Sequence, residues 1–128
     1  MLRILVVEDE VLVAFVLREG LQDLGATVTV AHSAAEATQA LSKGTFAAAV
    51  IDMLLPDMNG EPFAKFCRRQ CPALPIVVTT GLHGPEIRSM FPGDSYLEVI
   101  EKPHETAQVQ AALERLGVVF TVTASSAQ

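Results

Sequence analysis

Short apolar runs alternate with helical stretches five times along this chain of 128 residues. The runs are rich in β-branched residues and predict strands at residues 3–7, 27–30, 46–51, 75–80 and 97–101. The intervening and final stretches predict helices at about residues 11–24, 33–43, 60–71, 85–91 and 105–116. Because strands that alternate with helices are joined by right-handed crossovers, this pattern favours a parallel sheet covered by helices on both faces.

The character of each run predicts its place in the sheet. Residues 46–51 are almost wholly apolar, as in a central strand, whereas Thr27–Val30 alternates polar and apolar residues like an edge strand. We therefore expect an α/β fold with a doubly wound, five-stranded parallel sheet in one domain, residues 1–117. Residues 118–128 form a C-terminal tail, in which residues 118–123 are either an extra strand or a sticky segment ahead of disordered residues 125–128.

Composition excludes several classes of function. The formal net charge is −6, and nine lysines and arginines are too few for a basic stripe, which argues against direct nucleic-acid binding. No apolar run reaches about 18 residues and no basic-then-apolar leader occurs, so we expect neither membrane insertion nor secretion. Cys67 and Cys71 share a predicted helix, where they indicate reduced thiols in a cytoplasmic protein rather than a disulfide or a zinc site.

Ionisable side chains follow three of the predicted strands at the point where each strand ends. Glu8 and Asp9 follow the first, Asp52 follows the third, and Lys102 follows the fifth. The carboxyl ends of these strands meet beside the point where the strand order reverses, so the four side chains should share one rim. Thr80, which ends the fourth strand, should offer its hydroxyl to the same place.

Such a cluster suits a divalent cation and a phosphoryl group. Neighbouring carboxylates repel one another, and Mg²⁺ relieves the repulsion while keeping positions for waters and a phosphate. Asp52 would attack as the nucleophile and Lys102 would pair with the phosphoryl oxygens. Taken singly, each residue also has an ordinary interpretation: a helix cap for Asp52 or Thr80, a dipole-stabilising acid for Glu8 or Asp9, a solvated surface lysine for Lys102. Their conjunction at four strand ends favours the functional interpretation.

The same residues resemble the receiver domain of two-component response regulators. The shared pattern, over about residues 2–117, consists of Val7-Glu8-Asp9-Glu10, Asp52 with Pro56 and Gly60, Thr80-Gly81, and Lys102-Pro103. The resemblance implies a flavodoxin-like (βα)5 fold with strand order 2-1-3-4-5. It also implies phosphorylation of Asp52 by a histidine kinase or a histidine phosphotransfer protein, which switches binding to a downstream protein partner.

The resemblance also assigns roles around the phosphoacceptor. Glu8 and Asp9 would be the acidic pair that holds Mg²⁺ together with Asp52, and the backbone carbonyl of Leu54 would be a further metal ligand. Thr80 would be the switch hydroxyl and Lys102 the phosphate-pairing lysine. A cis peptide bond is expected before Pro103.

One position departs from the family pattern. Receivers usually carry Tyr or Phe three residues before the lysine, where this chain has Val99. A valine has no ring that could swing between core and solvent, so the usual coupling of threonine and aromatic ring cannot operate. We expect output to run through the loop after the fourth strand and through residues 84–95.

The first helix carries more apolar residues than a core needs. One helical face holds Val13, Val16, Leu17, Leu21 and Leu24. Leu12 and Phe15 lie off that face, beside the acidic rim, where they either anchor the helical bundle of the phosphodonor or pack under a neighbouring loop.

We expect a stand-alone receiver, because Met1 lies just before the first strand and no output domain follows. The alternatives are a non-phosphorylated interaction module, a receiver fragment of a hybrid kinase, and a small-molecule phosphatase. The phosphatase would need a second acid two residues after the nucleophile, and Leu54 occupies that place, so we expect no enzyme activity. The apolar first helix and tail leave a homodimer open.

Overall fold

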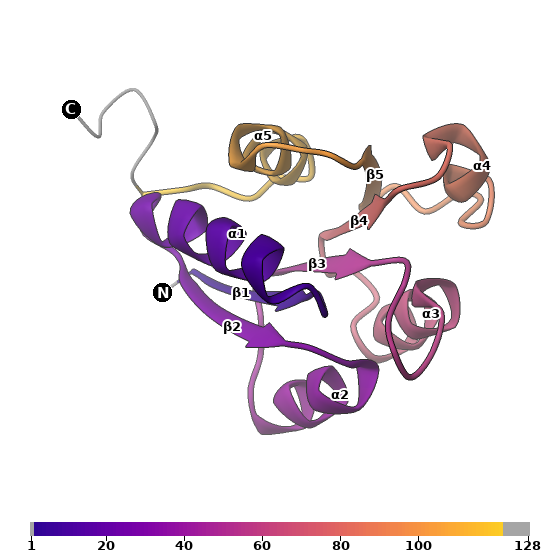
Figure 1. The fold of residues 1–128 in the computed structure, drawn as a ribbon, viewed down its shortest axis with the longest axis horizontal. Coiled ribbons are helices and arrows are strands. Elements are labelled where there is room, and N and C mark those ends of the chain that lie inside the picture. Colours follow the sequence, from indigo (N-terminus) through magenta and orange to yellow (C-terminus); the bar gives the residue numbers. More distant parts are fainter. Residues whose placement is uncertain (1, 122–128) are drawn as a thin grey trace.

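A parallel sheet forms the centre of the molecule in the computed structural model, which describes residues 2–121. Its strands run in the order β2-β1-β3-β4-β5, and every neighbouring pair is parallel (Figure 1). The strands are β1 (Arg3–Val7), β2 (Thr27–Ala31), β3 (Ala48–Asp52), β4 (Ile76–Thr80) and β5 (Leu97–Glu101). This order confirms the predicted doubly wound α/β fold and places a reversal of strand order between β1 and β3.

Helices cover both faces of the sheet, as the alternation predicts (Figure 1). In the described residues they are α1 (Val11–Asp23), α2 (Ala34–Lys43), α3 (Gly60–Gln70), α4 (Gly84–Arg88) and α5 (Thr106–Arg115). Helices α1 and α5 share one face, and α2, α3 and α4 share the other. Among these described helices, none has the length and the apolar character needed to span a membrane.

Two hydrophobic cores result, because successive side chains of a strand point to opposite faces. In β1, Leu5 and Val7 pack into the core beneath α2, α3 and α4, whereas Ile4 and Val6 pack into the core beneath α1 and α5. Every residue of β3 and β4 is buried. The apolar run at residues 46–51 is therefore central, as predicted, and the sheet is a rigid support for the loops at its carboxyl edge.

Two predicted elements are displaced. Strand β3 covers Ala48–Asp52 instead of residues 46–51, because its pairing with β1 begins at Ala48; Phe46 packs instead beneath the Arg3 guanidinium, 4.8 Å from ring centroid to Cζ. Asp52 is consequently the last paired residue of the strand, opposite Thr79, and not the first residue beyond it. Helix α4 ends at Arg88 rather than near residue 91, since the chain continues as turns toward Pro92, which cannot extend a helix.

The chain after α5 returns to the core beneath α1 and α5 (Figure 1). The Val118 amide donates to the Leu113 carbonyl, 3.0 Å away, and the side chains of Val118 and Phe120 are buried. Residues 118–121 carry no strand, and the rest of the predicted segment, residues 122–123, lies outside the described residues together with 124–128. These last packed residues therefore complete one core without extending the sheet.

Truncation of Phe120 should destabilise the fold, whereas its neighbour is a matched control. Phe120 is 7% exposed and Val119 is 80% exposed. We expect Phe120→Ala to lower the free energy of unfolding by about 2–4 kcal/mol, and Val119→Ala to change it by less than about 0.5 kcal/mol. Urea unfolding followed by circular dichroism measures both. Equal stability of the two variants would show that the segment contributes nothing to the core.

Candidate functional site

A lysine and two buried acids meet where β1, β3 and β5 end. The Lys102 ammonium donates to Glu8 Oε1 and to Asp52 Oδ2, both at 3.0 Å. Glu8 lies 94 positions and Asp52 lies 50 positions before the lysine in the sequence, so the strand order brings them together. Asp9 completes the acidic cluster: one carboxylate oxygen from each of Glu8, Asp9 and Asp52 lies within 4.8 Å of the other two.

Burial makes the cluster electrostatically strained. Glu8 and Asp52 are buried, whereas Asp9 is exposed. Burial, with the neighbouring Asp52 carboxyl, raises the pKa of Glu8 from 4.5 to about 7 despite the hydrogen bond from Lys102. Burial alone would lower the pKa of Lys102, but the hydrogen bonds to Glu8 and Asp52 outweigh it and raise that pKa above its usual value.

The donor set fits a hard divalent cation. When all three carboxylates are ionised beside the one ammonium, the cluster has a formal charge of −2 (−3 and +1). Burial first, and the neighbouring Asp52 carboxyl second, keep the pKa of Glu8 raised even though Lys102 donates a hydrogen bond to it. Carboxylate oxygens grouped at a solvent-accessible rim are ligands that Mg²⁺ prefers, and an ion of charge +2 would balance the cluster.

The loop after Asp52 folds back toward the acid. The Leu54 amide donates to Asp52 Oδ1 at 3.2 Å, and Leu54 pairs with Asn59 in an isolated antiparallel bridge. Gly60 closes the loop, because its amide donates to the Met53 carbonyl at 2.7 Å and a Cβ there would lie 2.5 Å from Met53 Cα. The close approach of the backbone in this loop therefore requires glycine at position 60, eight residues after Asp52.

Thr80 lies beside the cluster but is already hydrogen-bonded. Its side chain is buried, and its hydroxyl oxygen accepts from the Leu82 amide at 2.9 Å, which is the capping contact considered from the sequence. The Thr80 carbonyl accepts from the Lys102 amide, so β4 and β5 fix the lysine backbone to the threonine. The peptide bond between Lys102 and Pro103 is cis.

Three further residues hold the loops of the site, and sequence reasoning missed them. His32 Nδ1 lies 3.0 Å from the Glu8 carbonyl, Asp57 contacts the start of α2, and Glu101 contacts the start of α4. Each contact is long-range, joining loops 17 to 24 residues apart. A short-range motif such as Ser33 with Glu36 is readable as a cap, but no local pattern pairs these three with their partners.

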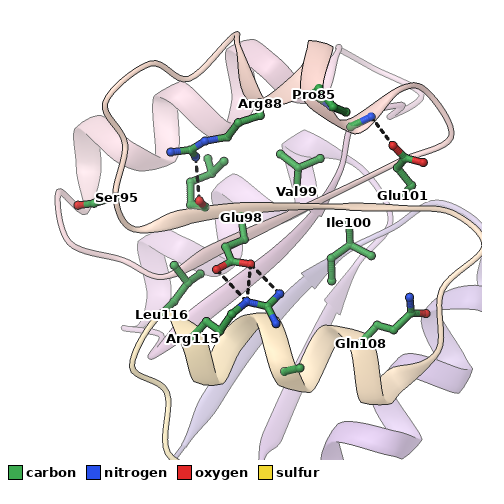
Figure 2. Close-up of a pocket in the computed structure, with 13 residues that line it drawn as sticks. Pro85, Arg88, Ser95, Glu98, Val99, Ile100, Glu101, Gln108, Arg115 and Leu116 are labelled. Atoms are coloured by element: carbon green, nitrogen blue, oxygen red, sulfur yellow. Dashed lines mark hydrogen bonds and ion pairs between the residues drawn. The ribbon is translucent and has the colours of Figure 1, made fainter.

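Val99 and Glu101 lie on the groove between α4 and α5 (Figure 2), which has a volume of about 1010 Å³. Val99 is half-buried and packs on the α4 side of β5, whereas Ile100 packs on the α5 side. Glu101 Oε2 accepts from the Gly84 amide at 2.6 Å. A Cβ at position 84 would lie 2.9 Å from that carboxylate oxygen, so a larger residue there would make the Glu101 side chain shift. Glu101, the residue before Lys102, thus binds the first residue of α4 by a hydrogen bond.

The amino-terminal half of α1 presents an apolar surface next to the acidic rim. Leu12 and Phe15 are exposed, so neither packs under a described loop. Val16, which the sequence placed on the core face, is also exposed, and Ala14 takes that place in the core instead. The helix is rotated relative to the expected face because Ala14, Leu17 and Leu21 are its buried residues.

Comparisons with known proteins agree on one family. A family model described as the response regulator receiver domain matches residues 4–114. Among curated proteins, the virulence transcriptional regulatory protein PhoP of Salmonella typhi is 31% identical over 116 residues, which cover 91% of this chain and 52% of the relative. The uncharacterized transcriptional regulatory protein YkoG of Bacillus subtilis is 28% identical over 120 residues, with 89% and 52% covered. The chain spans about half the length of these relatives.

Solved structures share the fold over nearly their whole length. The chemotaxis response regulator CheY4 of Vibrio cholerae superposes with a TM-score of 0.82 at 26% identity, covering 91% of this chain and 98% of that one. A response regulator receiver protein from Sinorhizobium medicae gives a TM-score of 0.80 at 29% identity, covering 90% and 93%.

The raised pKa of Glu8 predicts an unusual pH dependence of stability in the metal-free protein. Between pH 4.5 and about 7 the folded chain keeps a proton on Glu8 that the unfolded chain has lost. This stabilisation is therefore present at low pH and is lost as the pH rises through about 7. We expect Glu8→Gln, which mimics the protonated acid, to match wild type near pH 4 and to exceed it by about 1–3 kcal/mol near pH 8.

Chemical denaturation in the presence of EDTA, at several pH values, measures this difference. A gap between the two proteins that stays constant with pH would contradict the assignment of the proton to Glu8.

Proposed function

This chain belongs to the family of response regulator receiver domains, and we propose that it accepts a phosphoryl group on Asp52 in a two-component or phosphorelay system. The observation that carries the proposal is the buried Asp52 carboxylate, held 3.0 Å from the Lys102 ammonium among two further acids. The donor would be a histidine kinase or a histidine phosphotransfer protein. Phosphorylation would switch binding to a downstream protein partner.

The arrangement supports a simple transfer. A carboxylate oxygen of Asp52 attacks the phosphorus of the donor phosphohistidine, and a P–O bond forms while the P–N bond breaks. The leaving imidazole nitrogen keeps the electron pair of that bond and takes up a proton. Lys102 turns from the carboxylates to the phosphoryl oxygens and offsets their charge.

Mg²⁺ is the cofactor we propose for this reaction. Glu8, Asp9 and Asp52 would hold it, together with the Leu54 backbone carbonyl. When bound, the ion neutralises negative charge on the phosphoryl oxygens. Leu54 offers no acid for general catalysis, which supports a phosphoacceptor without enzyme activity of its own. Free Cys67 and Cys71 suit a reducing compartment, and we place the protein in the cytoplasm.

Output would pass to the start of α4, since Val99 cannot serve as an aromatic switch. Lys102 and Thr80 flank the phosphoacceptor, and their backbones are joined by the bond from the Lys102 amide to the Thr80 carbonyl. Glu101 precedes Lys102 and accepts from the Gly84 amide (Figure 2). A movement of Thr80 and Lys102 toward the phosphoryl group would therefore be transmitted through Glu101 to α4. The loop after β4 would take the place of the ring in changing the partner surface.

Phosphorylation of Asp52 is the direct test of the proposed function. With Mg²⁺ and acetyl phosphate, we expect one phosphoryl group per chain by intact-mass spectrometry, no label in Asp52→Ala, and none with EDTA. Phosphotransfer profiling against histidine kinases would then identify the donor. Absence of label on wild type would favour a non-phosphorylated interaction module.

The exposed α1 surface is the proposed docking site for the phosphodonor. Val11, Leu12, Phe15 and Val16 expose apolar side chains within one turn or two of the acidic rim. Exposed apolar side chains next to a reaction centre are typical of protein contacts. A helical bundle carrying the phosphohistidine could cover them while it presents the phosphoryl group to Asp52.

Truncation of Phe15 separates docking from chemistry. We expect Phe15→Ala to reduce phosphotransfer from a cognate kinase by about tenfold, with unchanged labelling by acetyl phosphate. Tyr96→Ala is a matched control, because Tyr96 is 45% exposed and Phe15 is 49% exposed, and Tyr96 lies after α4 away from the rim. A kinase reaction equally fast with both variants would remove Phe15 from the docking site.

A further inference from the structure

The loop that follows the phosphoacceptor is tied to a helix on the same side of the sheet. Asp57 Oδ1 accepts from the Ala34 amide and Oδ2 accepts from the Ala35 amide, each at 2.9 Å. These amides are the first two of α2, where helical N–H groups have no partner within the helix. Asp57 is therefore a cap supplied from 22 to 23 residues away, and these two hydrogen bonds lower its carboxyl pKa below the usual value.

Asp57 holds the exposed tip of the loop, residues 56–58. The base of the loop is closed by the Gly60 amide on the Met53 carbonyl and by the pairing of Leu54 with Asn59. In the described part of the chain, the hydrogen bonds that join residues 55–58 to another helix or strand are those of Asp57. Leu55 packs in the core beneath α2, α3 and α4, and beyond it the two hydrogen bonds of Asp57 fix the exposed loop tip to the start of α2.

The same end of α2 also holds the acidic loop after β1. His32, two residues before α2, places Nδ1 3.0 Å from the Glu8 carbonyl. A carbonyl oxygen only accepts hydrogen bonds, so Nδ1 carries the hydrogen and donates it. Residues 32–35 therefore connect to the loop that carries Glu8 and Asp9, through His32, and to the loop that follows Asp52, through Asp57.

We propose that Asp57 is a positioning residue for the metal site: it fixes the loop that carries Leu54, so that the site is formed before Mg²⁺ arrives. The inference rests on the proposed function, in which the Leu54 carbonyl is a ligand. A loop that is already ordered loses little conformational freedom when it binds, whereas a released loop must be ordered at the expense of affinity. Replacing a residue that holds a metal ligand in place commonly lowers metal affinity by about 10- to 100-fold.

Two substitutions of Asp57 and one control distinguish positioning from charge and from general stability. Asp57→Ala loses both hydrogen bonds and the charge. Asp57→Asn loses the charge but keeps one side-chain oxygen that accepts a hydrogen bond. Ser33→Ala removes the local cap of the same helix, in which Ser33 Oγ accepts from the Glu36 amide at 3.1 Å, and leaves the loop untouched.

The experiment measures Mg²⁺ affinity by isothermal titration calorimetry and amide hydrogen exchange of residues 54–58 without metal. We expect Asp57→Ala to weaken Mg²⁺ binding about tenfold and to speed exchange in the loop, Asp57→Asn to lie between it and wild type, and Ser33→Ala to match wild type in both. Equal Mg²⁺ affinity in Asp57→Asn and Asp57→Ala would reduce the effect to charge and overturn the proposal, as would unchanged affinity in Asp57→Ala.

The two measurements also separate this inference from the proposed function. If wild type binds no Mg²⁺, the proposed function fails, and loop exchange still reports on the tether. Unchanged exchange in Asp57→Ala would then overturn the positioning role as well.

Discussion

Lys102 holds together two buried carboxylates that would otherwise repel one another. Its ammonium lies 3.0 Å from both Glu8 and Asp52, and these residues stand at the ends of three different strands. The contact exists because the sheet order places β1 beside β3 and because β5 ends at the same edge. Burial keeps the pKa of Glu8 near 7 even so, which means that the cluster is poised to take up further positive charge.

Everything around this cluster restricts how the loops can move. Strands β3 and β4 beneath it are buried along their whole length, and Gly60, Asp57 and His32 attach the loops to neighbouring elements. Glu101 connects the same edge to α4. A reaction at one carboxylate would thus affect two neighbouring helices. Toward α2 the contacts favour a fixed site, and toward α4 the Glu101 carboxylate joins the carboxyl end of β5 to the first residue of the helix.

The fold and the position of the acidic cluster were predictable because the sequence signals for both are local. Apolar runs and caps predicted each strand and helix, and acids at strand ends predicted the cluster once the sheet was assumed parallel. The bounds of β3 were displaced because its pairing begins at Ala48 and ends at Asp52, opposite residues of β1 and β4 that no local pattern reveals. The tethers of Asp57, His32 and Glu101 depend on tertiary distances, and the face of α1 depends on how Ala14 fits the sheet.

Binding of Mg²⁺ and beryllofluoride, a stable mimic of the acyl phosphate, can be followed directly by amide NMR of the labelled protein. If Asp52 accepts a phosphoryl group beside Lys102, amide shifts should change at residues 8–9, 52–58 and 80–84 and at Glu101 and Lys102. The spectrum of Asp52→Ala should then stay unchanged with beryllofluoride. A wild-type spectrum that beryllofluoride leaves unaltered in the presence of Mg²⁺ would contradict phosphoryl acceptance at this site. Changes confined to the acidic loops, without residues 81–84, would leave acceptance intact but contradict output through α4.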